Sequence, residues 1–345
     1  AFLIYKIGWD KIKDVFTMFT WWQFAVLVFS LFLALIFVAI STMIILRALG
    51  HKTKFRDMFP LAFVNFTIGY LTPIPYAGGE PVQIYLMHKR MHIPVSAGTT
   101  AMILERVARQ IVVLIVILVG VTLAVFTIPM NGILKALLVA LMIFFIFVLW
   151  AYFSKSLSGQ GFLRYMIKIF RLQNLKIVKK PKHARVIENI DTHTTNFLAG
   201  HPKSFWVMLA LASIWTFVMV SQIILVLYFM GYTPTVSNVL LLYMFTNLIV
   251  LIPTPAMLGT YEAGGMMVFA IEGLDAGFGL VFSLIMRIAN VFAIIPGLLI
   301  LPYYGLSIRE AMGSQEKFRK DIEEVVPLNH KKIGQNPIKS IMKKD

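Results

Sequence analysis

The sequence contains two similar interruptions, each within a long stretch of apolar residues. The first reads Pro-Ile-Pro-Tyr-Ala-Gly-Gly-Glu over residues 73–80, and the second reads Pro-Thr-Pro-Ala-Met-Leu-Gly-Thr-Tyr-Glu over residues 253–262. Each is followed, in the next apolar run, by an arginine, Arg106 or Arg287. A duplicated helix break at hydrophobic depth is typical of transporters whose substrate site lies between two internal repeats. The pair of interruptions therefore predicts both an architecture and the place of a functional site.

The composition indicates a membrane protein. Hydrophobic residues make up 59% of the chain and charged residues 14%, whereas soluble domains are roughly 45–50% apolar and about 25% charged. The net charge of +16 is typical of basic cytoplasmic loops, so we expect membrane lipids with anionic headgroups as partners and no nucleic acid. The sequence has no cysteine, which excludes disulfide and thiolate chemistry. We predict a multi-pass protein of the cell membrane.

A helix that spans a bilayer needs about 20 apolar residues. Five runs meet this length: 22–46, 97–128, 133–153, 205–230 and 276–301. Shorter segments flank the two interruptions: 58–72, 81–87, 239–252 and 263–271. Arms of this size extend only about 10–22 Å, which is less than the ~30 Å hydrocarbon core. We predict an all-α polytopic membrane protein with Pro/Gly-broken re-entrant helical hairpins at 57–90 and 237–272.

The distribution of charge predicts the orientation of the hairpins. Basic residues flank the first hairpin, and the segment 154–203 holds ten Lys and Arg residues against two acids. These segments should be cytoplasmic. The second hairpin is bounded by the uncharged segment 231–236 and the acidic turn 272–275, which we expect outside. The two hairpins would then enter from opposite faces, which defines an inverted-topology repeat.

The predicted organisation has three parts. Repeat one comprises residues 1–128, and repeat two comprises residues 133–304 with the cytoplasmic basic linker 154–203 inside it. A basic cytoplasmic tail covers residues 305–345. Because the sequence opens with Ala-Phe-Leu-Ile-Tyr, we expect the first transmembrane helix to be truncated in this numbering.

Ionisable side chains in spanning segments cost roughly 2.5–3.5 kcal/mol each and need a partner or a wet cavity. Glu105 and Arg109 are four residues apart, so they should form a supporting ion pair along one helix face. Arg106 points in another direction and is expected to pair outside its own helix.

The likeness of the two interruptions suggests that Glu80 faces Arg106 and that Glu262 faces Arg287. These pairs are interpreted either as closed structural salt bridges or as sites whose arginines also bind an anionic headgroup. Glycines precede the second arm of each hairpin, where the N-terminus of a half-helix favours an anion. The candidate substrate-binding residues are Glu80, Arg106, Glu262, Arg287, Gly78, Gly79, Gly259, Thr260 and Tyr261. The predicted hairpin breaks are Pro73, Pro75, Pro253 and Pro255.

Further polar residues lie near the interruptions, among them Asn65, Gln83 and Asn247. Each is interpreted as a helix–helix hydrogen-bonding group in preference to a ligand contact. The sequence has no nucleophile elbow, no metal-spaced His/Asp pair and no phosphate-binding loop. We therefore predict no catalytic residue, no metal and no cofactor, and we do not expect an enzyme.

At these residues the chain resembles the membrane region of the lysylphosphatidylglycerol synthases, a family with many stand-alone members. The resemblance rests on Pro-x-Pro-x-Ala-Gly-Gly-Glu-Pro, on Leu-Glu-Arg at 104–106, and on the second Pro-Thr-Pro segment with its glutamate and Arg287. It covers roughly residues 20–305 of this sequence. It implies a lipid flippase, with Glu80, Glu105, Arg106, Glu262 and Arg287 as the matching positions. The soluble synthase domain of the bifunctional members is not in this sequence, so we do not expect it to make aminoacyl lipid.

The favoured function is therefore a flippase or scramblase for an anionic, aminoacylated or glycosylated phospholipid or a polyprenyl-phosphate lipid. One alternative is a non-transporting membrane scaffold that binds lipid and presents it to a partner enzyme. Another is a membrane-embedded transferase that acts on a lipid phosphate. A lipid-biosynthetic enzyme and a second copy of the chain are the protein partners that these functions suggest.

Overall fold

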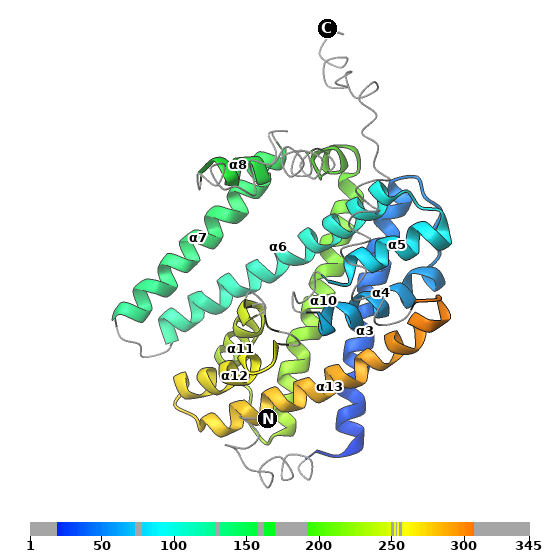
Figure 1. The fold of residues 1–345 in the computed structure, drawn as a ribbon. Coiled ribbons are helices and arrows are strands. Elements are labelled where there is room, and N and C mark those ends of the chain that lie inside the picture. The colour runs from blue at the N-terminus through cyan, green and yellow to red at the C-terminus, as the bar shows by residue number, and fades with distance from the viewer. Residues whose placement is uncertain are drawn as a thin grey trace.

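The computed structural model describes residues 19–72, 78–127, 132–157, 162–169, 192, 194–249, 252, 254 and 257–306. Within these residues every regular element is a helix (Figure 1). The labelled helices are α3 (Trp21–Ala48), α4 (Phe55–Leu71), α5 (Glu80–Met91), α6 (Val95–Thr127), α7 (Gly132–Leu157), α8 (Phe162–Ile169), α10 (Pro202–Phe229), α11 (Val236–Leu248), α12 (Thr260–Ile271) and α13 (Ala276–Tyr303). The predicted all-α membrane protein is confirmed at this level.

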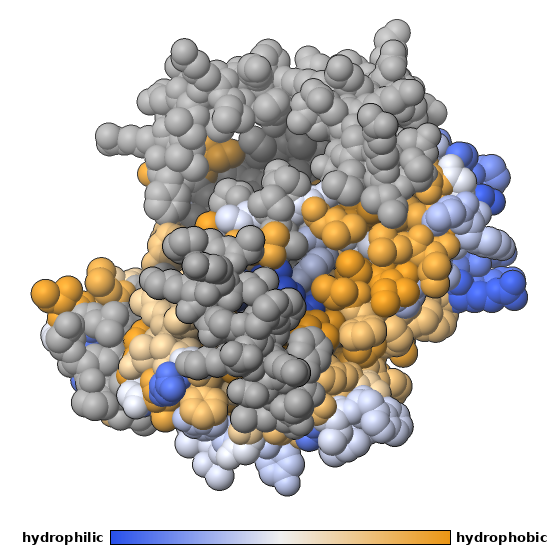
Figure 2. Space-filling model, turned by 60° about the horizontal axis from the view of Figure 1, so that its bottom comes forward, coloured by the Kyte–Doolittle hydropathy of each residue, from blue (hydrophilic) through white to orange (hydrophobic). Residues whose placement is uncertain are grey.

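Among the described residues, four helices, α3, α6, α10 and α13, are long and apolar enough to cross a membrane. A fifth long helix, α7, packs against α6 and coincides with the remaining predicted span. Large apolar side chains such as Phe29, Phe217 and Leu299 are exposed on these helices. Such surface suits lipid, where the backbone polar groups must be satisfied inside each helix. Figure 2 shows apolar residues over much of the described surface, with strongly hydrophilic residues at one edge.

The two predicted interruptions separate pairs of shorter helices. The first lies between α4, with 17 residues, and α5, with 12 residues. The second lies between α11, with 13 residues, and α12, with 12 residues. At 1.5 Å per residue these helices are about 18–26 Å long, so each is shorter than the ~30 Å hydrocarbon core. The prolines Pro73, Pro75, Pro253 and Pro255 lie outside the described residues.

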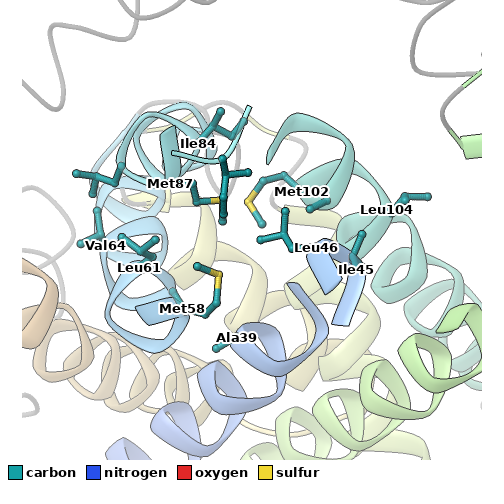
Figure 3. Close-up of a cluster of buried hydrophobic side chains, with 14 of the residues drawn as sticks. Ala39, Ile45, Leu46, Met58, Leu61, Val64, Ile84, Met87, Met102 and Leu104 are labelled. Atoms are coloured by element: carbon teal, nitrogen blue, oxygen red, sulfur yellow. The ribbon is translucent and has the colours of Figure 1, made fainter. Parts of the chain in front are cut away.

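Two hydrophobic clusters fill opposite ends of the bundle. The first joins the end of α3 and the start of α6 to α4 and α5, as Figure 3 shows for Leu46, Met58, Met87 and Met102. The second joins the start of α3 and the end of α6 to α11 and α12. Because α3 and α6 run from one cluster to the other, the two pairs of short helices lie at opposite ends of the molecule.

The first arm of each short pair packs against a long helix from the other half of the chain. Helix α4 contacts α13, and helix α11 contacts α6. Thr67 of α4 donates a hydrogen bond from Oγ1 to the backbone oxygen of Ile294, at 3.1 Å. Gly297 permits this approach, because an added Cβ there would overlap Thr67. At the centre, α3 and α10 lie side by side (Figure 1).

Helices α12 and α13 touch through their backbones. An added Cβ on Gly265 would overlap the backbone oxygen of Gly279, and an added Cβ on Gly279 would overlap that of Gly265. Small residues at such a crossing let helix backbones approach closely, which is a usual basis of helix packing in membranes. Helix α12 is thereby fixed to α13 by direct backbone contact.

Candidate functional site

The first interruption brings Glu80 of α5 next to Arg106 of α6. Glu80 Oε1 and Arg106 Nη2 are 2.6 Å apart, as expected from the likeness of the two motifs. The Arg106 side chain is 35% exposed and that of Glu80 is 23% exposed. A guanidinium that keeps accessible surface is chemically suited to an anionic group such as a phosphate.

Two glycines hold this site close to α4. Gly79 is the N-cap of α5. An added Cβ on Gly79 would overlap the backbone oxygen of Asn65, and one on Gly78 would overlap the side chain of Thr72. The chain therefore returns against α4 as α5 begins. The first turn of a helix leaves N–H groups without intrahelical partners and carries partial positive charge, which favours an anion.

The second interruption places Glu262 of α12 against Arg287 of α13. Arg287 Nε donates to Glu262 Oε1 at 2.7 Å. The other carboxylate oxygen accepts from the backbone N–H of Gly259 at 2.9 Å, and Arg287 Nη2 donates to the Met257 backbone oxygen at 3.2 Å. The Arg287 and Glu262 side chains are only 16% and 7% exposed. Protein donors and acceptors thus enclose this pair far more than the first pair.

Gly259 allows this enclosure because its φ of +81° lies in the left-handed region. A side chain there would be strained, whereas glycine adopts this conformation freely. The turn that results directs the Gly259 N–H towards the Glu262 carboxylate. Gly259 thus has a backbone role at the start of α12, and its predicted contact with a substrate stays a prediction.

Tyr70 of α4 reaches the second ion pair from the other half of the chain. Tyr70 is 5% exposed, and its hydroxyl is hydrogen-bonded to Arg287, the partner of Glu262. Tyr70 also belongs to a small apolar cluster with Ile249 and Met257. The sequence analysis did not single out Tyr70. The sequence feature that could have identified Tyr70 was its position as a polar residue three positions before the first Pro-x-Pro segment.

The supporting ion pair between Glu105 and Arg109 is present on α6. Arg109 Nε lies 2.8 Å from Glu105 Oε1, and Arg109 Nη2 donates to Glu105 Oε2, also at 2.8 Å. The guanidinium of Arg109 lies over the ring of Trp215 from α10, at 5.1 Å from its centroid. The ion pair lies within α6, and the contact of Arg109 with Trp215 joins α6 to α10.

Thr260 and Tyr261 have protein partners at the start of α12. Thr260 Oγ1 donates to the Met257 backbone oxygen at 3.1 Å and lies 3.0 Å from Thr254 Oγ1. The Tyr261 backbone oxygen accepts from Ser283 Oγ at 3.1 Å. These bonds order the start of α12. A substrate contact by either residue stays a prediction.

Two of the polar residues near the interruptions do not bridge helices as expected. Asn247 Nδ2 donates within its own helix, to the Tyr243 backbone oxygen at 2.8 Å. Gln83 is fully buried, yet neither its Nε2 nor its Oε1 has a hydrogen-bond partner in the part of the chain that the structure describes. The expected helix–helix hydrogen bonds are therefore wrong for Asn247 and Gln83. In both cases the residue type indicated a polar role but not the direction in which the side chain points.

The described residues hold no group of three or more His, Asp and Glu side chains that could bind a metal ion. The charged groups near the interruptions instead form acid–base pairs. Such pairs can exchange one partner for a charged ligand group, and this is the chemistry that the site offers.

Comparison with known proteins gives one match. The family model described as the lysylphosphatidylglycerol synthase TM region matches residues 1–297. Comparison with curated proteins and with solved structures gives no match. The matched range includes both interruptions and the ion pairs Glu80–Arg106, Glu105–Arg109 and Glu262–Arg287.

Proposed function

Because this chain belongs to the lysylphosphatidylglycerol synthase TM-region family, we propose that it transports a lipid between the two leaflets of a membrane. The substrate would be a lipid with an anionic headgroup: an anionic, aminoacylated or glycosylated phospholipid, or a polyprenyl phosphate. The headgroup would pass through a polar path between the two pairs of short helices while the lipid tails stay in the bilayer.

The observation that carries this proposal is the charged pair at each interruption. Glu80 and Glu262 lie at the starts of α5 and α12, and their partners Arg106 and Arg287 lie within the long apolar helices α6 and α13. Ionisable residues at membrane depth are costly, and they generally mark pathways for charged or polar substrates. A transported phosphate would compete with a glutamate for an arginine, so the arginine would stay paired with an anion during binding and release.

The packing of the helices supports an inverted repeat. Exchanging α3 with α10, α4 with α11, α5 with α12 and α6 with α13 reproduces the principal helix contacts. Under this exchange the contact of α4 with α13 becomes that of α11 with α6. The two short pairs would then be re-entrant hairpins from opposite faces, and the match to an inverted repeat favours alternating access.

The inner ends of the two short pairs approach each other. Tyr70 and Leu71 of α4 pack with Ile249, which follows α11, and with Met257, which precedes α12. A headgroup that entered along one hairpin would therefore arrive near the start of the other. This continuity supports transfer between leaflets in preference to two unrelated surface sites.

Reconstitution into liposomes tests the proposal. A fluorescent phosphatidylglycerol is placed in both leaflets, and an impermeant quencher is added outside. We expect the protein to make the inner label accessible, and we expect Arg106→Ala to slow this by about tenfold or more, as for loss of a charge-assisted contact. Lys203→Ala, at the exposed start of α10, is the matched loss of a positive charge.

Two results would argue against transport. If the wild-type protein left the inner label protected, the transport proposal would fail. If it also bound the lipid, the scaffold function would be favoured. Conversion of labelled lipid to a new product by the purified protein would favour the transferase.

A further inference from the structure

The two ion pairs are unequal in a way that separates their roles. Glu262 has an arginine on one carboxylate oxygen and the Gly259 N–H on the other. Arg287 additionally donates to the Met257 backbone oxygen. The charges of Glu262 and Arg287 are thus already satisfied by groups of the protein. Arg106 and Glu80 keep roughly a third and a quarter of their side-chain surface exposed.

Gln83 lies beside the more exposed pair. It is fully buried, and both atoms of its amide are without a hydrogen-bond partner in the described residues. A buried amide normally finds partners, because removing it from water without replacement bonds is costly. Apolar residues of similar size would avoid this cost. The buried amide of Gln83 therefore indicates a bound ligand that supplies the missing hydrogen bonds.

The position of Gln83 on α5 fixes where such an occupant would sit. Gly79 packs against α4 and Glu80 faces α6, and Gln83 follows them by one turn, between these two faces. Its backbone N–H donates to the Gly79 oxygen at 3.0 Å. Side chains of a helix lean towards its N-terminus, so the amide of Gln83 leans towards Gly79 and Glu80.

We propose that Gln83, Arg106 and the N-terminus of α5 form the headgroup-binding half of the site, and that Glu262–Arg287 is a fixed clasp that positions the helices. This deepens the proposed function and rests on it for the nature of the ligand. Arg106 would bind the phosphate in exchange for part of its contact with Glu80. Gln83 would donate from Nε2 to a phosphate oxygen.

The chemistry of Gln83 narrows the ligand class. Its Nε2 can only donate, and its Oε1 can only accept. A phosphate alone satisfies the donor and leaves the acceptor unpaired. The amide is satisfied when the phosphate ester also carries a hydroxyl or ammonium group near the phosphate. We therefore assign the site to phosphodiester headgroups with such a donor, such as a glycerol or aminoacyl-glycerol headgroup.

The decisive experiment measures lipid binding and thermal stability of the full chain in phosphatidylcholine nanodiscs. The probes are phosphatidylglycerol and phosphatidylmethanol, which are both phosphodiesters but differ in the headgroup hydroxyls. Soluble glycerol 3-phosphate tests whether the free phosphate ester is enough. We expect the wild-type protein to prefer phosphatidylglycerol over phosphatidylmethanol by about tenfold, the value of one or two hydrogen bonds.

The variant Gln83→Leu tests whether Gln83 contacts the ligand or is only a buried polar residue of the core. Because leucine removes the unpaired buried amide, we expect a higher melting temperature without lipid. We also expect the preference for phosphatidylglycerol to disappear. Gln110→Leu, an exposed glutamine of α6, is the matched control and should retain the preference. If Gln83→Leu stabilises the protein and leaves the preference intact, Gln83 is only a buried polar residue and the inference is overturned.

The clasp is tested in the same assay. Arg287→Lys should lower the melting temperature but leave the lipid preference of the folded protein within about twofold. Arg106→Lys should reduce lipid binding by about tenfold, because lysine cannot make the two-point contact of a guanidinium with a phosphate. Equal losses of binding in both variants would refute the division of roles. Binding with these preferences but without leaflet exchange would refute transport and leave the headgroup site standing. If Gln83→Leu changed neither lipid binding nor leaflet exchange, the proposed role of Gln83 would be refuted and the transport proposal would stand.

Discussion

Tyr70, near the end of α4, lies against Arg287 in the middle of α13, although the two residues are 217 positions apart in the sequence. The contact joins the arm before the first interruption to the ion pair of the second. It shows that the ion pair of the second interruption is completed by a residue from the first half of the chain. The ion pair of α12 and α13 is consequently part of the same packing unit as α4.

We expect Tyr70→Phe to destabilise the protein by about 1–3 kcal/mol, because a buried hydroxyl next to a charged pair is lost. Thermal unfolding in detergent measures this change. Tyr228→Phe is the control, since the Tyr228 side chain is 68% exposed and should tolerate the loss. Equal melting temperatures for Tyr70→Phe and the wild type would mean that the hydroxyl contributes nothing to the clasp.

Glu262→Gln should destabilise the protein more than Glu80→Gln. Loss of a carboxylate leaves Arg287 enclosed without its counter-charge, which costs about 3–5 kcal/mol for buried pairs. Arg106 is more exposed, so loss of Glu80 should cost less. Melting temperatures of the two variants give the comparison. The reverse order would contradict the assignment of the second pair as the enclosed one.

Gly265→Ala should destabilise the protein by about 1–3 kcal/mol, as overpacking does, because the new methyl group meets the Gly279 backbone. Gly98→Ala on α6 is the matched control. An added Cβ there lies 3.4 Å from the nearest atom, in Ile84, which is an ordinary contact. This control should be neutral or slightly stabilising, because alanine favours a helix over glycine. A stable Gly265→Ala would show that α12 and α13 can separate without loss.

Glu272, in the turn between α12 and α13, makes stability depend on pH. Burial raises the pKa of its carboxyl above the ordinary value of 4.5, and hydrogen bonds from Ser237 and Asn238 offset part of this. The folded protein therefore favours the protonated carboxyl. The stability that this group contributes is fully present below pH 4.5 and is lost as the pH rises through the higher folded pKa.

Melting temperatures of the wild type and Glu272→Gln between pH 4 and pH 8 check this sign. The melting temperature of the wild type should fall relative to that of the variant as the pH rises. A wild type that gains stability relative to Glu272→Gln over this range would contradict the raised pKa.

We expect the amide hydrogens of α5 to exchange faster than those of α12. Met87 of α5 lies in one cluster with Met58 of α4 and Met102 of α6, and methionine side chains adapt readily to movement of a neighbour. The backbone of α12 lies directly against α13 at Gly265. Hydrogen exchange of the reconstituted protein would reveal the difference, and slower exchange in residues 80–91 than in residues 260–271 would contradict it.

The sequence predicted the long helices and the interruptions because these depend on local signals. Apolar length marks a spanning helix, and proline with glycine marks its break. Both predicted arginine–glutamate pairs followed from the cost of a lone charge at membrane depth. Their unequal enclosure could not be foreseen, since it depends on how Met257, Gly259 and Tyr70 arrange around Arg287.

Contacts between distant segments explain the other differences. Asn247 and Gln83 were expected to bridge helices, but the partner of a polar side chain depends on the rotation of each helix. The contact of Gly265 with Gly279 follows from the crossing of α12 and α13, which no local pattern specifies. The orientation in the membrane and the substrate contacts remain predictions, because they concern molecules outside the chain.

The reciprocal packing of α4 on α13 and of α11 on α6 means that the protein cannot be divided into two self-sufficient pieces. A fragment that ended before α10 would leave Thr67 facing lipid in place of the Ile294 carbonyl. Its complement would lack Tyr70 beside Arg287. Each fragment would be an incomplete fold, and only co-assembly of the two would restore the missing surfaces.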